Sequence, residues 1–135
     1  MKKRKIIALF LVMALLLSAC GGKVLGVRKV YGDSRQFSRW EIGSAMQTVT
    51  RFFAREFDGC TMIRLEYDEE KTKKEAAAWA EQYDASEAIV LLSDFRVDAS
   101  GGDGSLNPDS TYRNYQWILT RTALGGWKLQ TWGYG

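Results

Sequence analysis

The spacing of the apolar residues changes at Gly59, and this change limits the folds that the chain can adopt. Between residues 38 and 59, apolar side chains recur every three or four positions, which is the spacing of one buried stripe on an α-helix. From Cys60 onward, apolar residues alternate with polar ones, as they do in a half-buried strand. A helix that leads directly into strands indicates an α+β domain.

Local signals mark both ends of this helix. Ser38 and Glu41 have the spacing of a capping box, in which the Ser38 hydroxyl accepts a hydrogen bond from the Glu41 amide and the carboxylate reaches back. Phe37 and Ile42 stand where a hydrophobic staple would form. Gly59 is predicted to stop the helix in a left-handed conformation.

Further elements follow in order along the chain. The strand predicted at residues 60–67 has one row of side chains formed by Thr61, Ile63, Leu65 and Tyr67. Asp68 can cap a second helix, whose inner face would carry Ala76, Trp79, Ala80 and Tyr83. Strands are also predicted at residues 88–97, 110–121 and 127–134, and a turn at 124–126 joins the last two as a hairpin.

This order predicts two helices packed on one face of a four-stranded, mostly antiparallel, curved sheet. Residues 88–92 are apolar at every position, so their strand is expected to be central. The single α+β domain is expected to span residues 38–135. Residues 20–37 are polar and rich in glycine, which favours a tether, although some of them could add a short edge strand.

The first twenty residues predict export. Lys2, Lys3, Arg4 and Lys5 are followed by twelve consecutive apolar residues and a small-residue exit that ends at Cys20. Twelve apolar residues are too few to span a bilayer, which takes about 20. We therefore expect residues 1–19 to be a signal peptide.

The segment 17–20 (LSAC) resembles the lipobox of bacterial lipoproteins. In that family the Cys thiol receives a diacylglyceryl group, the signal is cut just before it, and the new amino terminus can also be acylated. The resemblance implies that Cys20 is the lipid attachment residue and the first residue of the mature chain. It also implies that the domain is held at the extracytoplasmic face of the cell membrane, with the lipid bilayer as its first partner.

Loss of the leader changes what the composition implies. Four of the 19 basic residues are removed, which leaves 15 against 16 acidic ones, so the net charge falls from +3 to about −1. A nucleic-acid partner is not expected, because such a partner needs a basic face. The remaining 116 of 135 residues suffice for one domain. Cys60 is then the only unmodified thiol, and we expect it to be a small buried hydrophobe.

Five short segments carry a second resemblance: 57–61 (FDGCT), 67–71 (YDEEK), 97–105 (VDASGGDGS), 126–129 (GWKL) and 132–134 (WGY). They resemble a family of small lipoproteins of Gram-positive bacteria that has no assigned activity. More distantly, a long helix followed by a meander that ends in Trp-Lys-Leu is similar to the cystatin-like and NTF2-like folds. Such scaffolds host enzymes, ligand binders and adaptors.

The chain contains no histidine, which excludes Ser-His-Asp and Cys-His catalysis and the usual His-bearing zinc sites. Catalysis by carboxylates would use Glu66, Asp94 and Asp98, which lie near predicted strand ends, and would need shifted pKa values. We expect no catalytic residue, cofactor or metal ion.

The segment 98–109 offers oxygen ligands that suit calcium, but it has glycine at the fifth position and no glutamate at the twelfth, so a self-bonded loop is favoured.

Aromatic residues gather in the last hairpin, and the candidates for a binding face are Tyr112, Tyr115, Trp117, Trp127 and Trp132. Aromatics on a sheet face left open by the helices could bind a glycan, a small ligand or an envelope protein or peptide. The alternative is that they pack in the core.

From the export signal and these aromatic residues together, we predict a membrane-anchored lipoprotein with a non-catalytic binding domain. The alternatives are a carboxylate enzyme of the NTF2-like type, with its pocket between helix and sheet, and a homodimer module.

Overall fold

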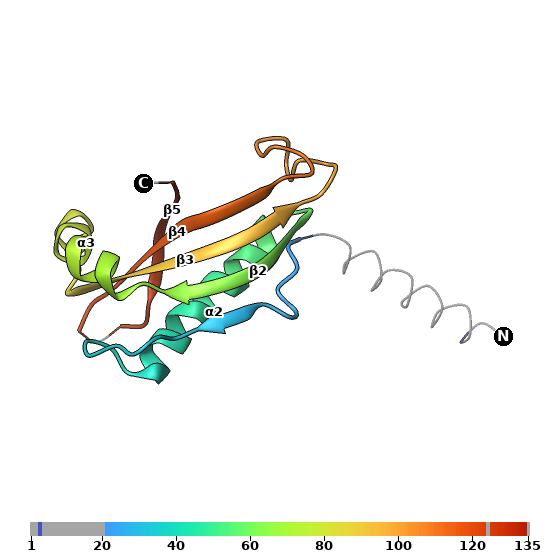
Figure 1. Cartoon of the computed structure of the whole chain (residues 1–135). Helices are drawn as coiled ribbons and strands as arrows, with labels where there is room; N and C mark the ends of the chain where they lie inside the picture. The colour runs from blue at the N-terminus through green and yellow to red at the C-terminus, as the bar shows by residue number, and fades with distance from the viewer. Residues whose placement is uncertain (1–2, 4–20, 124, 135) are drawn as a thin grey trace.

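The computed structural model describes residues 3, 21–123 and 125–134, so the predicted signal peptide and Cys20 lie outside the described residues. The described elements are β1 (Arg28–Val30), α2 (Arg39–Glu56), β2 (Cys60–Tyr67), α3 (Glu69–Gln82), β3 (Glu87–Val97), β4 (Thr111–Arg121) and β5 (Lys128–Gly133). The strands form one sheet in the order β1-β2-β3-β4-β5 (Figure 1). The predicted α+β class is confirmed.

The helix α2 follows its local sequence signals. The amide of Glu41 donates to Ser38 Oγ at 3.1 Å, and the amide of Ser38 donates to Glu41 Oε2 at 2.9 Å, which completes the predicted capping box. The buried stripe consists of Ile42, Ala45, Met46, Val49, Thr50 and Phe53. Gly59 has a positive φ of 73° beyond the helix end, and a Cβ there would lie 2.6 Å from an Asp98 carboxylate oxygen, so only glycine fits.

The two helices lie on opposite faces of the sheet, so the prediction that they share one face is wrong (Figure 1). Helix α2 covers the face that contains Trp117. Helix α3 packs on β3 and β4 from the other side, where Trp79 contacts the buried side chains Val90, Leu92 and Ile118. Because the start of β3 is apolar on both faces, each face needs a cover to leave water.

The segment before α2 lies along the domain rather than extending away as a tether. The amide of Gly22 donates to the carbonyl oxygen of Ala54 at 3.0 Å, and Lys23 exchanges backbone hydrogen bonds of 2.9 Å with Cys60 and Met62. Strand β1 then pairs in parallel with β2. The edge-strand alternative is therefore correct, and the sheet is five-stranded and mixed instead of four-stranded, while β2 to β5 form the predicted antiparallel meander.

Strand β2 contains a bulge that changes which side chains face the core. The pairing with β3 shifts between Met62 and Arg64, and Ile63 is left 48% exposed. The predicted alternation placed Ile63 in the same row as Leu65, but Met62 is the buried residue before the bulge and Leu65 the first after it. One extra residue in a strand reverses the facing of every residue that precedes it.

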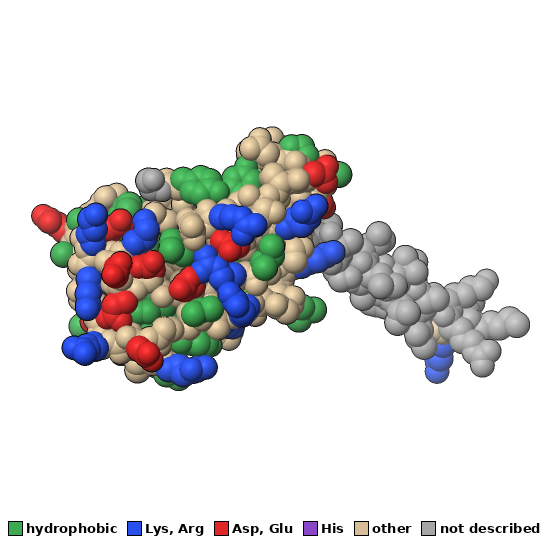
Figure 2. All heavy atoms as spheres, viewed as in Figure 1, with side chains coloured by type: hydrophobic (Ala, Val, Ile, Leu, Met, Phe, Trp, Pro, Cys, Tyr) green, Lys and Arg blue, Asp and Glu red, His purple; other side chains and the backbone are tan. Residues whose placement is uncertain are grey.

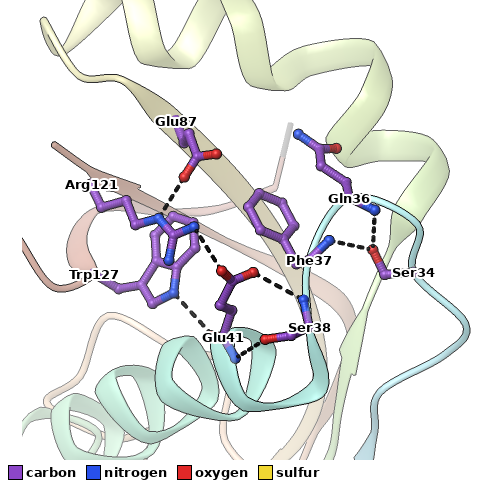
Figure 3. A network of polar contacts seen from close by, with 8 residues as sticks. All are labelled: Ser34, Gln36, Phe37, Ser38, Glu41, Glu87, Arg121 and Trp127. Atoms are coloured by element: carbon purple, nitrogen blue, oxygen red, sulfur yellow. Dashed lines mark hydrogen bonds and ion pairs between the residues drawn. The ribbon is translucent and has the colours of Figure 1, made fainter. Parts of the chain in front are cut away.

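A network of ion pairs and hydrogen bonds joins the start of α2 to β3, to β4 and to Trp127, which immediately precedes β5 (Figure 3). The Arg121 guanidinium donates to Glu87 at 2.6 Å and to Glu41 at 3.3 Å, and it lies 4.4 Å from the centre of the Trp127 ring. The indole Nε1 of Trp127 in turn donates to the backbone carbonyl of Glu41 at 3.0 Å. The role of Trp127 is therefore to hold the start of the helix on the hairpin.

Candidate functional site

A pocket with a volume of about 240 Å³ lies at the carboxyl end of α2. We call it the loop pocket, because the segment that follows β3 forms one of its sides. Helix α2, the turn that follows it, the loop after β3, β4 and β5 contribute the lining residues Phe52, Glu56, Phe57, Asp58, Gly102, Asp103, Ser105, Leu106, Tyr115 and Trp132. The loop and part of the aromatic hairpin, which are separate in the sequence, thus border one cavity.

Four aromatic side chains supply most of the apolar lining. The ring of Phe52 lies 4.5 Å from that of Trp132, between centroids, and 6.3 Å from that of Phe57. The Tyr115 ring lies 6.2 Å from Phe57 on the sheet side. Trp132 remains 42% exposed, whereas Tyr115 is only 9% exposed. A ligand in this pocket would therefore contact aromatic rings on both its helix side and its sheet side.

Acidic side chains supply the charge at the loop pocket. Glu56, Asp58 and Asp103 are exposed, and the described residues that line the pocket include no Lys or Arg. The hydroxyl and the amide of Ser105 both donate to the Asp103 carboxylate, which lowers the pKa of that group, so it is ionised at neutral pH. A cleft lined by one sign of charge attracts ligands of the opposite sign.

The loop after β3 is stabilised by hydrogen bonds of its own, as predicted. Ser100 donates its amide and its hydroxyl to Asp98, and Ser105 does the same to Asp103. The amide of Asn107 donates to the phenolic oxygen of Tyr112 at 3.1 Å, which fastens the loop to β4. Within residues 21–123 and 125–134, no three carboxylate or thiol side chains are grouped as a metal ion would require.

The five aromatic candidates lie on the side of the sheet that α2 covers, not on an open face. Trp117 is completely buried, and its indole Nε1 donates to Ser93 Oγ at 2.7 Å. Trp127 is 8% exposed and belongs to the same core. The packing alternative is therefore correct for these two residues. Tyr112 supports the loop, and only Tyr115 and Trp132 line the loop pocket.

The carboxylates considered for catalysis do not meet in a cavity. Asp94 accepts hydrogen bonds from Arg64 at 3.1 and 3.2 Å and from the amide of Asn114 at 2.9 Å. These partners lower the pKa of Asp94, with the Arg64 hydrogen bonds as the main cause. Glu66 forms an ion pair with the same Arg64, and Asp98 lies apart in the loop. Asp94 and Glu66 thus belong to one ion-pair cluster around Arg64. Asp94 also lacks the raised pKa that a general acid needs.

Cys60 is buried, as predicted, with 1% of its surface exposed. Burial, followed by the negative charges of Asp98, Asp103 and Asp58, raises the pKa of its thiol to about 11. A thiol with such a pKa is a poor nucleophile at neutral pH. Cys60 therefore contributes packing near the loop pocket and no chemistry.

Sequence reasoning did not identify the residues at the end of α2 that line this site. The apolar spacing places Phe52 and Phe57 in the buried stripe of the predicted helix, and nothing in the sequence singles out Glu56 as a site residue. One sequence signal points to these residues: Phe52, Phe53 and Phe57 together occupy a wider part of the helix circumference than a single buried stripe. A side chain outside the stripe can reach a second layer of structure.

Comparison with protein families, with curated proteins and with solved structures found no match to this chain. Among the described residues, the helices are too short or too polar to cross a bilayer.

Proposed function

We propose that the protein is a lipoprotein held at the extracytoplasmic face of the cell membrane through Cys20, and that its domain binds a small organic cation in the loop pocket without catalysis. The observation that carries the ligand class is the combination of four aromatic rings with three exposed carboxylates in one pocket. The anchor is supported by the order of basic residues, apolar run and lipobox-like segment at the amino terminus.

The ligand class follows from the chemistry of the lining. The faces of aromatic rings attract cations, and carboxylates add attraction at longer range. A volume of about 240 Å³ lies below the usual range for drug-sized ligands. The pocket therefore suits a single ring or a short chain that carries an amine. It could also receive one basic side chain of a peptide or an envelope protein.

A carboxylate enzyme is disfavoured by the directions of the pKa shifts. The pKa values of Asp94, Asp98 and Asp103 are all lowered by hydrogen bonds, which keeps these groups ionised. A general acid would need burial without such donors. Binding without chemistry requires only the charge and the aromatic surface.

The anchor is tested by growing cells on labelled palmitate with the wild-type chain and with Cys20→Ser. The wild type is expected to carry the label and to sediment with membranes, and the variant is expected to carry none. Labelled Cys20→Ser, or an unlabelled wild type in the cytosol with its leader intact, would overturn the anchor.

The pocket is tested by NMR titration of the full chain in nanodiscs of neutral lipid, with benzylamine as the cationic probe. The indole N–H signal of Trp132 should shift with saturable dependence on concentration, while that of the distant, 78% exposed Trp40 should not. Benzoate, which has the same ring and the opposite charge, should produce no saturable shift. Equal shifts with both probes would refute recognition of a cation.

A further inference from the structure

The edge of the sheet formed by β1 carries cations and exposed apolar side chains together. We call it the β1-edge surface and define it by Lys23, Leu25, Arg28, Lys29, Arg39 and Trp40. Leu25 is 94% exposed and Trp40 is 78% exposed, more than any other large hydrophobic side chain of the described residues. Exposed apolar side chains that lie beside positively charged side chains are typical of surfaces that meet a lipid interface.

The backbone presents Leu25 at the tip of a tight turn. The amide of Val27 donates to the carbonyl of Val24 at 3.3 Å, and Gly26 has a positive φ of 82°. The turn projects at the edge of the sheet, between the bridge of Lys23 with Thr61 and the start of β1. No packing requirement of the domain explains an apolar residue at this tip.

The cations of the β1-edge surface are available to an external anion. Residues 21–40 contain five basic residues and one acidic residue. Lys23, Arg28, Lys29 and Arg39 form no ion pair with any described residue. Lys29, Arg39 and Trp40 also line a wide, open hollow of about 650 Å³ with Tyr31, whose ring lies 4.2 Å from the Arg39 guanidinium.

The segment between Cys20 and the packed Gly22 is too short to hold the domain far from the bilayer. Gly22 is bonded to Ala54 and packed so closely that a Cβ would lie 2.4 Å from the Phe53 carbonyl oxygen. Cys20 precedes Gly22 by two residues, which span about 7 Å when fully extended. A lipid-modified Cys20 would therefore bring the bilayer within reach of the domain surface.

Charge decides which surface faces the bilayer. The end of the molecule near Gly22 also carries the loop after β3, where Asp98, Asp103 and Asp109 are exposed, and Asp58 lies beside it. Figure 2 shows acidic side chains at the loop end, while Lys and Arg are interspersed with Asp and Glu over the rest of that face. The excess of positive charge lies in residues 21–40, which include β1. Anionic headgroups repel the first region and attract the second.

We propose that the β1-edge surface lies on anionic phospholipid headgroups, with Leu25 and Trp40 inserted at the interface, so that α2 runs along the membrane plane. The inference rests on the proposed anchor at Cys20. The anchor and the surface then act as two signals, which together hold a protein more firmly than one acyl chain does. The acidic rim of the loop pocket would be tilted away from the lipid and stay open to solvent.

The test uses the full lipidated chain in vesicles of 30% phosphatidylglycerol and 70% phosphatidylcholine. Single cysteines replace Leu25, Trp40, Asn107 or Ala77, all exposed, and carry a fluorophore that a lipid-borne quencher can reach. The buried Cys60 thiol escapes labelling. Quenching at Leu25→Cys and Trp40→Cys should exceed that at Asn107→Cys and Ala77→Cys at least threefold. The double variant Lys29→Glu with Arg39→Glu should abolish the excess, and the control Lys73→Glu with Lys74→Glu on α3 should keep it.

Each other outcome overturns the proposal in a distinguishable way. Greater quenching at Asn107→Cys than at Trp40→Cys would mean that the domain stands on its loop end. Flotation with vesicles but no quenching at any position would refute the surface and leave the anchor intact. If mass spectrometry finds no acyl group on Cys20, the anchor fails, and the surface survives only if Leu25→Cys and Trp40→Cys are still quenched. Displacement of both labels from lipid by soluble polyphosphate would reassign the surface to an anionic polymer.

Discussion

Trp132 on β5 lies against Phe52 on α2, with ring centroids 4.5 Å apart and ring planes tilted by 52°. This contact brings the last strand to the end of the first helix and forms one wall of the loop pocket. The same wall continues through Trp117, which pairs with Trp132 across β4 and β5. The pocket thus grows out of the aromatic core rather than from a separate surface layer.

The substitution Trp132→Ala should weaken benzylamine binding at least tenfold, because it removes the most exposed aromatic wall of the pocket. A tenfold loss corresponds to about 1.4 kcal/mol. The melting temperature should fall by only a few degrees, since the ring is already 42% exposed. Calorimetric titration measures the binding, and Trp40→Ala is the matched control that should retain it. Unchanged affinity in Trp132→Ala would place the ligand elsewhere.

The buried hydrogen bond between Trp117 and Ser93 should be visible in stability. Ser93→Ala leaves the indole N–H without its 2.7 Å acceptor and should lower the free energy of unfolding by about 1–3 kcal/mol. Trp117→Phe in the Ser93→Ala background removes the orphaned donor, so the second change should cost less than it does in the wild type. Urea denaturation of the four chains gives the coupling, and strict additivity would argue against it.

Asp94 should make stability depend on acidity. Its pKa is lowered in the folded chain by Arg64, so it stabilises the fold above its unfolded pKa of about 3.9, and this contribution is lost as the pH falls. Asp94→Asn should therefore be less stable than the wild type at pH 7, and the two should converge near pH 2. Urea denaturation across this range tests the prediction, which a constant difference would contradict.

Cys60 should make stability depend on alkalinity in the opposite sense. Burial raises its folded pKa to about 11, above an unfolded value of about 8.5, so the stability it confers is full below that value and declines as the pH rises. At pH 8 the folded thiol should react with an aromatic disulfide about 100-fold more slowly than the thiol in urea. Comparable rates in the two states would show that the thiol is accessible in the folded chain.

The first helix and the class of the fold could be predicted, because the signals that set them are local. The Ser38 capping box and one apolar stripe suffice to place α2. The face occupied by α3 could not be predicted from its own alanine-rich stripe. The informative residues were Val90 and Leu92, which form a second apolar face on β3 that needed its own cover.

Other errors came from pairing between distant segments. The bulge beside Ile63 leaves the alternating pattern of β2 unchanged in the sequence and exists only in its register with β3. The polar, glycine-rich residues 20–37 favour a tether over the edge strand that they also allow, and backbone hydrogen bonds to Ala54, Cys60 and Met62 decide for the strand. For the site, the loop and the aromatic hairpin could each be recognised in the sequence. The contact of β5 with α2, which brings them to one pocket, depends on tertiary packing that no local pattern shows.

The most direct test of cation binding in the loop pocket is a calorimetric series with three probes of the same shape, namely benzylamine, benzyl alcohol and benzoate. The full chain is compared with the double variant Glu56→Gln with Asp103→Asn, which removes two carboxylates of the pocket without changing its size. We predict that the wild type binds benzylamine at least tenfold more tightly than benzyl alcohol, that it does not bind benzoate, and that the double variant loses this preference. Equal affinity of the wild type for all three probes, or an unchanged preference in the double variant, would contradict the account.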